Sequence, residues 1–183
     1  MFIQTEKTPN PATLKFLPGV AVSEYGPTEF KGPDEAARAP LAQRLFGIQG
    51  VRSVFFGNDF VSITKAGDTD WNMLKPMALA ALMEHFSTGQ PVMLEPEKKQ
   101  AAGEDDDAIT AQIRELIQTR VRPAVMMDGG DIVFDRFEDG VVYLFMRGAC
   151  SGCPSSTVTL KSGIENMLRH YVPEVTEVRQ VQD

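Results

Sequence analysis

Apolar residues in the C-terminal part of the chain recur at helical spacing in two places. The first stripe consists of Ile109, Ile113, Leu116, Ile117 and Val121. The second consists of Leu160, Ile164, Met167, Leu168 and Tyr171. Because Pro123 disfavours helical geometry in the residue before it, we expect the first helix to end near Arg122. Pro173 marks the end of the second helix.

Between these helices the pattern changes to that of strands. The segments DIVFDRF (131–137) and VVYLFMRG (141–148) are rich in β-branched and aromatic residues, and Asp139-Gly140 between them is a strong hairpin signal. The segment EVTEVRQV (174–181) predicts a last strand. Two glycines in MDGGD (127–131) suit a tight reversal before the hairpin, so Asp128 and Asp131 are expected to serve as turn and cap hydrogen-bonding groups.

The N-terminal part predicts a similar mixture of strands and helices. Extended segments are expected around 2–7 and 13–16, a helix entered at Pro40, and a hairpin over 51–65 that turns at Gly57-Asn58-Asp59. A second helix is expected from about 74 to 86, beginning close to Pro76, because a proline deep inside a helix removes a hydrogen bond.

The bulky side chains around this second helix are expected to pack in the core, and they are Phe55, Phe56, Trp71, Met77 and Met83. His85 is expected to be an ordinary histidine on the helix surface.

A polar run, EPEKKQAAGEDDD (95–107), separates the two parts and contains no aromatic or β-branched residue. We interpret it as a solvated, flexible, acidic linker, with its final aspartates, Asp105 to Asp107, at a helix start. The predicted domains are therefore residues 1–95 and 108–183, joined by residues 96–107. Each is a small α+β domain, and the second is a small β-sheet packed with two helices.

Charge and composition exclude several functions. The net charge is −7 and no basic cluster stands out, so nucleic acid is a poor partner. No apolar segment approaches the roughly 18 residues that a membrane span needs. The first residues resemble neither a signal peptide nor a transit peptide, so we expect a cytoplasmic protein.

The only two cysteines, Cys150 and Cys153, lie in RGACSGCPSS (147–156). A strand delivers Cys150 to a turn, Gly152 permits an unusual backbone angle, and Pro154 begins the next helix. Free N–H groups at a helix start favour thiolate over thiol. The pair is a candidate disulfide, redox dithiol or half of a metal site.

Counting ligands favours half of a site. Tetrahedral zinc and a cubic iron-sulfur cluster each take about four protein ligands. The chain has no third cysteine, and the histidines, His85 and His170, have no motif neighbour. Two copies related by a two-fold axis would bring four thiolates to one point, which would couple metal binding to dimerisation and make the site labile.

Three other interpretations stay open from the residues alone. A thioredoxin-like oxidoreductase carries this spacing at a helix start, although the usual aromatic neighbour, the Gly-Pro between the cysteines and a βαβ crossover into the cysteine strand are absent. A zinc site shared by two chains is the second. A purely structural pair of buried thiols is the third, and polar turn-forming neighbours such as Ser151 and Ser155 argue against it.

The segments RPAVMMDGGDI and GACSGCPSSTVTLKSGIENMLRHYVPEV together resemble the C-terminal domain of NifU and Nfu iron-sulfur cluster scaffold proteins. The segment EKTPNPATLKFLPG resembles the N-terminal domain of the bacterial and mitochondrial Nfu branch, so the resemblance spans nearly the whole chain. The Met126-Met127 pair is a small departure from the more polar residues expected there.

The resemblance implies a non-enzymatic carrier that binds a [4Fe-4S] cluster between two subunits, with Cys150 and Cys153 as ligands. It implies a homodimer when the cluster is bound, upstream cluster assembly machinery as the source, and apo iron-sulfur proteins as acceptors. The first domain is expected to help recognise those acceptors. The absence of a targeting extension favours a bacterial cytoplasm, with the mitochondrial matrix as the alternative for a processed or trimmed eukaryotic homologue.

Overall fold

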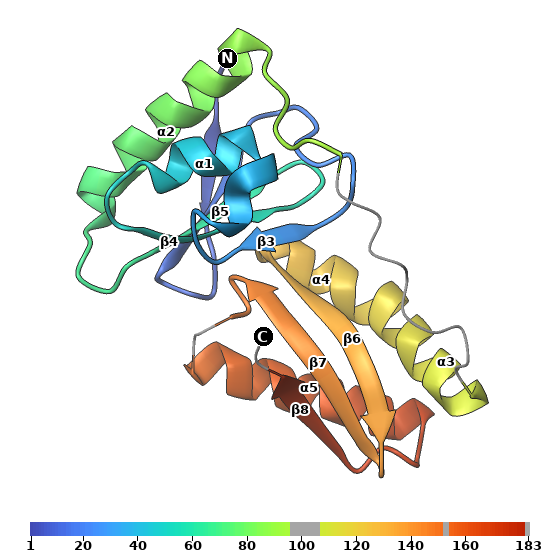
Figure 1. Ribbon diagram of the computed structural model, residues 1–183. Coiled ribbons are helices and arrows are strands. Elements are labelled where there is room, and N and C mark those ends of the chain that lie inside the picture. Colours follow the sequence, from blue (N-terminus) through green and yellow to red (C-terminus); the bar gives the residue numbers. More distant parts are fainter. Residues whose placement is uncertain (96–106, 152–153, 182–183) are drawn as a thin grey trace. The chain divides into compact units, whose positions relative to one another are not determined.

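The structure is a computed structural model that describes residues 1–95, 107–151 and 154–181 (Figure 1). The chain divides into two compact units, Met1–Lys99 and Gln100–Asp183. Both contain a β-sheet and helices, which confirms the predicted α+β class. Of the linker expected at 96–107, only Asp107 lies within the described residues.

The first unit is built on a five-stranded antiparallel sheet in the order β1-β2-β5-β4-β3. Its strands are β1 (Gln4–Lys7), β2 (Thr13–Leu17), β3 (Thr28–Phe30), β4 (Val51–Phe56) and β5 (Val61–Lys65). Its helices are η1 (Glu35–Arg38), α1 (Pro40–Phe46) and α2 (Trp71–Thr88). Both expected extended segments, the helix entered at Pro40 and the β4–β5 hairpin are confirmed.

Helix α2 begins earlier than Pro76 suggested. Asp70 caps its start by accepting a hydrogen bond from the Asn72 N–H at 2.9 Å, and Pro76 lies inside the helix. Pro76 lacks the N–H that would donate to the Asn72 carbonyl, so the helix loses one ladder hydrogen bond there. The cap therefore outweighs the proline in deciding where the helix begins.

The side of α2 that is buried also differs from the expectation. The buried residues are Leu74, Ala78, Leu82 and His85. Met77 and Met83, which were expected in the core, are 49% and 42% exposed, whereas Phe55 and Phe56 are buried as expected and Trp71 is half-buried. The small Ala78 faces inward where α1 packs closely against α2, so the neighbouring helix selects the buried stripe.

His85 is fully buried, so its expected place on the helix surface is wrong. Both ring nitrogens lack a hydrogen-bond partner among the described residues. Desolvation lowers the pKa of His85 below its ordinary value, and the positive charge of Arg44 lowers that pKa further. The backbone of Pro91 and Gln90 opposes both effects without reaching hydrogen-bond geometry.

The second unit is built on a three-stranded sheet in the order β6-β7-β8. Its strands are β6 (Gly130–Glu138), β7 (Val141–Gly148) and β8 (Glu177–Val181). Asp139 and Gly140 both have positive φ, at 51° and 76°, in the tight turn that joins β6 to β7. Helix α5 (Pro154–Tyr171) then crosses over to β8, which runs parallel to β7. The hairpin, the second amphipathic helix and the last strand are confirmed.

The first helix of this unit continues beyond Arg122, where it was expected to end. It comprises α3 (Ala108–Leu116), the π-helical segment η2 (Ile117–Val121) and α4 (Arg122–Met127). The Arg122 N–H donates to the Ile117 carbonyl, five residues back. The π step widens the ladder just before Pro123, so the proline ring fits where a regular turn would place a carbonyl against it.

The start of this helix agrees with the expectation for the aspartates. Asp107 accepts a hydrogen bond from the Thr110 N–H at 2.8 Å. Hydrogen bonds from the side chain and the backbone of Thr110 lower the pKa of Asp107. Asp105 and Asp106 lie outside the described residues. No helix in the described ranges has the length and apolar character that crossing a bilayer requires.

Candidate functional site

Cys150 lies directly after β7, on the turn that leads toward α5. The Cys150 N–H donates to the Arg147 carbonyl at 3.3 Å, and the N–H of Ser151 donates to the Gly148 carbonyl at 3.1 Å. Gly148 has a φ of 60°, a conformation that strongly favours glycine. The chain therefore reverses within a few residues, and these backbone hydrogen bonds fix the place of Cys150.

The thiol of Cys150 occupies space that a glycine leaves open. Gly130 pairs with Gly148 in the β6–β7 ladder, and a Cβ atom added to Gly130 would lie 2.5 Å from Cys150 Sγ and 2.8 Å from the Cys150 nitrogen. The preceding Gly129 has a φ of 81°, and its carbonyl accepts the N–H of Ala149 at 3.2 Å. We call residues 148–151, which contain Cys150, the cysteine turn. Residues 129 and 130 thus bring the reversal before β6 against the cysteine turn.

Sequence reasoning gave these two glycines only a role in chain reversal. The reversal is present, but Gly130 has the second role of accommodating the thiol. The signal in the sequence was the pair of adjacent glycines in MDGGD, of which the turn needs only one with positive φ. Nothing in the local sequence indicated that the other would lie against Cys150.

Cys150 is only 7% exposed, at the margin of the apolar core of the second unit. Cys153, the other predicted ligand, lies outside the described residues. Helix α5 begins at Pro154, immediately after Cys153 in the sequence. The positive end of an 18-residue helix therefore follows the cysteine pair in the chain, as the sequence predicted.

Asp131, one residue beyond Gly130, forms a buried ion pair instead of the expected turn or cap hydrogen bond. Its side chain is fully buried, and its two oxygens accept from Nε and Nη2 of Arg122, both at 2.9 Å. Such bidentate geometry holds two groups in one orientation. The pair therefore fixes the start of α4 to the start of β6, and with it the position of Gly129 and Gly130.

The remaining candidate ligands lie elsewhere. His170 is exposed in the last turn of α5, with its ring edge-to-face against Tyr171. His85 is buried in the core of the first unit. Within residues 1–95, 107–151 and 154–181, no three His, Cys, Asp or Glu side chains cluster closely enough to hold a metal ion.

Comparison with known proteins identifies both units. Residues 3–89 match the family described as "Scaffold protein Nfu/NifU N terminal", and residues 113–179 match the "NifU-like domain". The human protein named "NFU1 iron-sulfur cluster scaffold homolog, mitochondrial" is 51% identical over 185 residues, which cover all of this chain and 73% of that protein. "NifU-like protein 4, mitochondrial" from Arabidopsis thaliana is 53% identical over 186 residues, covering 98% of this chain and 66% of that protein.

Among solved structures, the solution structure of a NifU-like protein from Saccharomyces cerevisiae is 30% identical, with a TM-score of 0.48. The match covers 52% of this chain and 87% of the yeast protein's solved chain. The names of the two relatives describe scaffold and NifU-like proteins and no catalytic activity. The names place these relatives in mitochondria, so they give no support to the expectation of a bacterial cytoplasm. Each unit matches a family model, and one relative is 51% identical over the whole of this chain, so the chain belongs to the Nfu/NifU family of iron-sulfur cluster scaffold proteins.

Proposed function

We propose that this protein carries a [4Fe-4S] cluster between two copies of the chain, with Cys150 and Cys153 of each copy as ligands, and transfers it to apo iron-sulfur proteins. The cluster is the cargo of the scaffold. The observation that carries the proposal is the cysteine turn, in which the β6–β7 hairpin and Gly130 hold the Cys150 thiol just ahead of α5.

The number of ligands supports the use of two chains. A closed cubic cluster takes about four thiolates, and this sequence contains two cysteines. The described parts of the chain offer no further cluster of metal-binding side chains. A two-fold axis beside the cysteine turn would double the ligand set with the same two residues and make a symmetric site.

The local electrostatics support binding through thiolates. The first N–H groups of α5 have no intrahelical acceptor and carry partial positive charge. Such a position favours the thiolate form, which is the form that binds iron. The cluster brings further negative charge from its sulfides, so N–H groups at this end of the helix would stabilise the loaded site.

A cluster held between two chains suits a donor better than an electron carrier. Each chain contributes only one pair of ligands, so the thiols of an acceptor can replace one pair at a time. Release of the cluster then separates the two copies without unfolding either of them. The proposed partners are therefore apo iron-sulfur proteins downstream and cluster assembly machinery upstream.

The test is anaerobic reconstitution of the purified full-length chain with ferrous iron and sulfide. We expect a brown product with about four iron and four sulfide per two chains. Its mass, measured by size-exclusion chromatography with light scattering, should be that of a dimer. Cys150→Ser and Cys153→Ser should each abolish loading. His170→Gln, which removes an imidazole in the last turn of α5, should leave loading unchanged.

Three results would contradict the proposal, and each corresponds to another interpretation of the cysteine pair. A colourless monomer that reduces disulfides would indicate a dithiol oxidoreductase. A dimer containing zinc and no sulfide would indicate a shared zinc site. A chain that binds neither metal nor cluster would indicate a structural role, for which the burial of Cys150 is the supporting observation.

A further inference from the structure

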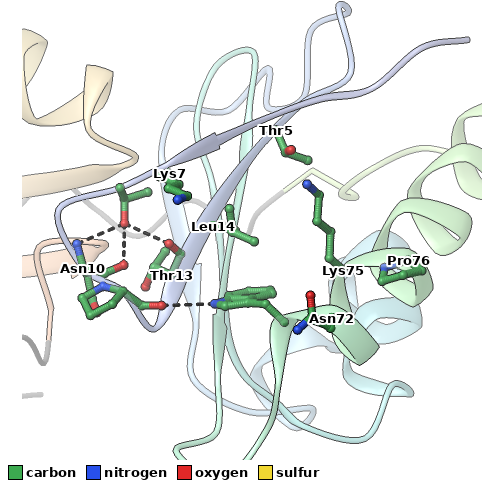
Figure 2. A pocket seen from close by; sticks show the side chains of 11 residues that line it. Thr5, Lys7, Asn10, Thr13, Leu14, Asn72, Lys75 and Pro76 are labelled. Carbon is green, nitrogen blue, oxygen red and sulfur yellow. Dashed lines mark hydrogen bonds between the residues drawn. The ribbon is translucent and has the colours of Figure 1, made fainter.

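The first unit contains a groove between its N-terminal hairpin and α2, drawn in Figure 2. We call it the β1–α2 groove. Its volume is about 630 Å³, within the roughly 300–1,000 Å³ of typical ligand sites. It is lined by Thr5, Lys7, Thr8, Asn10, Pro11, Thr13, Leu14, Trp71, Asn72, Lys75 and Pro76.

Hydrogen bonds fix the end of the groove where the hairpin turns. The Trp71 indole N–H donates to the Pro11 carbonyl at 3.1 Å, which ties the start of α2 to the hairpin (Figure 2). The Thr8 hydroxyl lies 2.8 Å from the Asn10 carbonyl and 2.9 Å from the Thr13 carbonyl, and its single proton is shared between them. The indole and the turn are thus preorganised, and a ligand would bind without first ordering them.

The charge of the groove is opposite to that of the protein. The charged residues of its lining are Lys7 and Lys75, and the lining includes no carboxylate. Neither lysine forms an ion pair with any residue in the described part of the chain. Yet the chain as a whole carries −7. Figure 2 shows the Lys75 side chain extending from α2 toward the hairpin. Two ammonium groups therefore belong to one groove whose lining contains no carboxylate.

The lining also offers apolar surface. Leu14 forms part of it from β2, and the half-buried Trp71 indole forms part of it from α2. A small anion such as phosphate would pair with the lysines but leave most of 630 Å³ empty. An extended peptide would fill it. β1 is the edge strand of the sheet, and among the described residues no further strand pairs with its outer side.

We propose that the β1–α2 groove binds an acidic, leucine-containing segment of a partner protein. Carboxylates of the segment pair with Lys7 and Lys75, and an apolar side chain packs on Leu14 and Trp71. This gives the first unit a means of holding an acceptor on the same chain as the cysteine turn, and in that respect it rests on the proposed function. The binding itself needs no cluster and no cysteine.

The experiment uses the full-length, cluster-free protein and the synthetic peptide Leu-Glu-Asp-Leu-Glu-Asp-Leu with blocked ends. Trp71 is the only tryptophan of the chain, so its fluorescence reports directly on the groove. We expect the fluorescence to change and then saturate as peptide is added. Added salt should weaken the binding. The matched peptide with Gln and Asn in place of Glu and Asp should bind at least about tenfold more weakly, because it loses every ion pair.

Variants locate the binding. Lys7→Gln and Lys75→Gln should each weaken binding about threefold, and the double variant about tenfold, as expected for partly exposed ion pairs. Lys31→Gln removes the same charge just after β3, at the opposite edge of the sheet, and should change binding less than twofold. Equal binding of the neutral peptide, or groove variants no weaker than Lys31→Gln, would overturn the inference.

Two further measurements complete the test. Displacement of the peptide by an equal concentration of inorganic phosphate would also overturn the inference, because it would show a site for small anions. Iron and sulfide content after reconstitution is measured on the same variants and should be unchanged. Failure of peptide binding with normal cluster loading refutes only this inference, whereas peptide binding without cluster loading refutes only the proposed function.

Discussion

The cysteine turn joins two elements that are consecutive in the chain, β7 and α5, whereas the β1–α2 groove joins Pro11 and Trp71, which are 60 residues apart. The cysteine turn depends on missing side chains, at Gly129, Gly130 and Gly148. The groove depends on side chains from separate elements that meet only after folding. A motif in the sequence can therefore reveal the first kind of site but not the second.

The two sites also differ in how they are held. An ion pair between a fully buried Asp131 and a partly exposed Arg122 supports the glycines of the cysteine turn. The groove is supported by neutral hydrogen bonds from Trp71 and Thr8. Removing one partner of a buried ion pair is more damaging than removing one neutral hydrogen bond. Substitution at the ion pair of the second unit should therefore lower stability more than substitution at the hydrogen bonds of the first unit.

The largest effect is expected for Asp131→Asn. The change leaves Arg122 without its bidentate partner and should lower the free energy of unfolding of the second unit by about 3 kcal/mol. Hydrogen exchange of the β6 and β7 amides, followed by mass spectrometry, measures this unit separately. Glu138→Gln, which removes one partner of an exposed ion pair with Arg136, should change the free energy of unfolding obtained from exchange by less than about 0.5 kcal/mol. Similar effects of both changes would mean that Asp131 does not support the turn.

The next effect is expected for Gly130→Ala. The added methyl would meet Cys150 Sγ and two backbone atoms closer than 3 Å, which should lower stability by about 2 kcal/mol and reduce cluster loading. Gly163→Ala is the matched control, because it lies within α5 with nothing within 4 Å of the new methyl, and should stabilise by about 0.5–1 kcal/mol. Normal loading of Gly130→Ala would show that the turn tolerates displacement of the thiol.

A smaller effect concerns His85 in the first unit. Its folded pKa lies below the ordinary 6.5, so on acidification the unfolded chain takes up the proton first. The free energy of unfolding therefore has its full value, as far as His85 is concerned, above pH 6.5. It decreases as the pH falls toward the lowered pKa of folded His85. Urea unfolding followed by Trp71 fluorescence should show this loss. His85→Met, which removes two unsatisfied nitrogens, should raise stability by about 1 kcal/mol and flatten the pH dependence. An unchanged pH profile in His85→Met would assign the loss to other groups.

The smallest effect is expected for Trp71→Phe. The change removes the hydrogen bond to the Pro11 carbonyl but keeps an aromatic ring, and should lower stability by about 0.5–1 kcal/mol. Urea unfolding followed by circular dichroism measures it, because the fluorescent probe is lost. If exchange of the 8–13 amides stays as slow as in the unchanged protein, the indole does not hold the turn.

Local chemistry predicted most of the elements. Asp139-Gly140 specified the β6–β7 turn because both residues tolerate positive φ, and the α5 stripe ended before Pro173 as predicted. The two helices that contain prolines were predicted less well. Pro76 is accommodated by an early helix cap and Pro123 by a π step, and each accommodation depends on neighbouring residues and not on the proline itself.

Side-chain burial was the least predictable feature. Met77 and Met83 are more hydrophobic than Ala78 and His85, yet the last two face the core of the first unit. The α2 sequence is apolar around much of its circumference, so periodicity alone does not select the buried face. Packing against α1 selects it, and this leaves the unpaired His85 ring inside.

The sequence by itself determined the number of cysteines, their place between a strand and a helix, and the family of the protein, because these depend on residue identity and short-range order. Only the tertiary structure decided that Gly130 faces the Cys150 thiol, that Asp131 binds Arg122, and that Lys7 and Lys75 share one groove. Spacing along the chain fixes what a segment can become. Which segments meet is fixed by the simultaneous burial of all their apolar faces, and no single segment encodes that outcome.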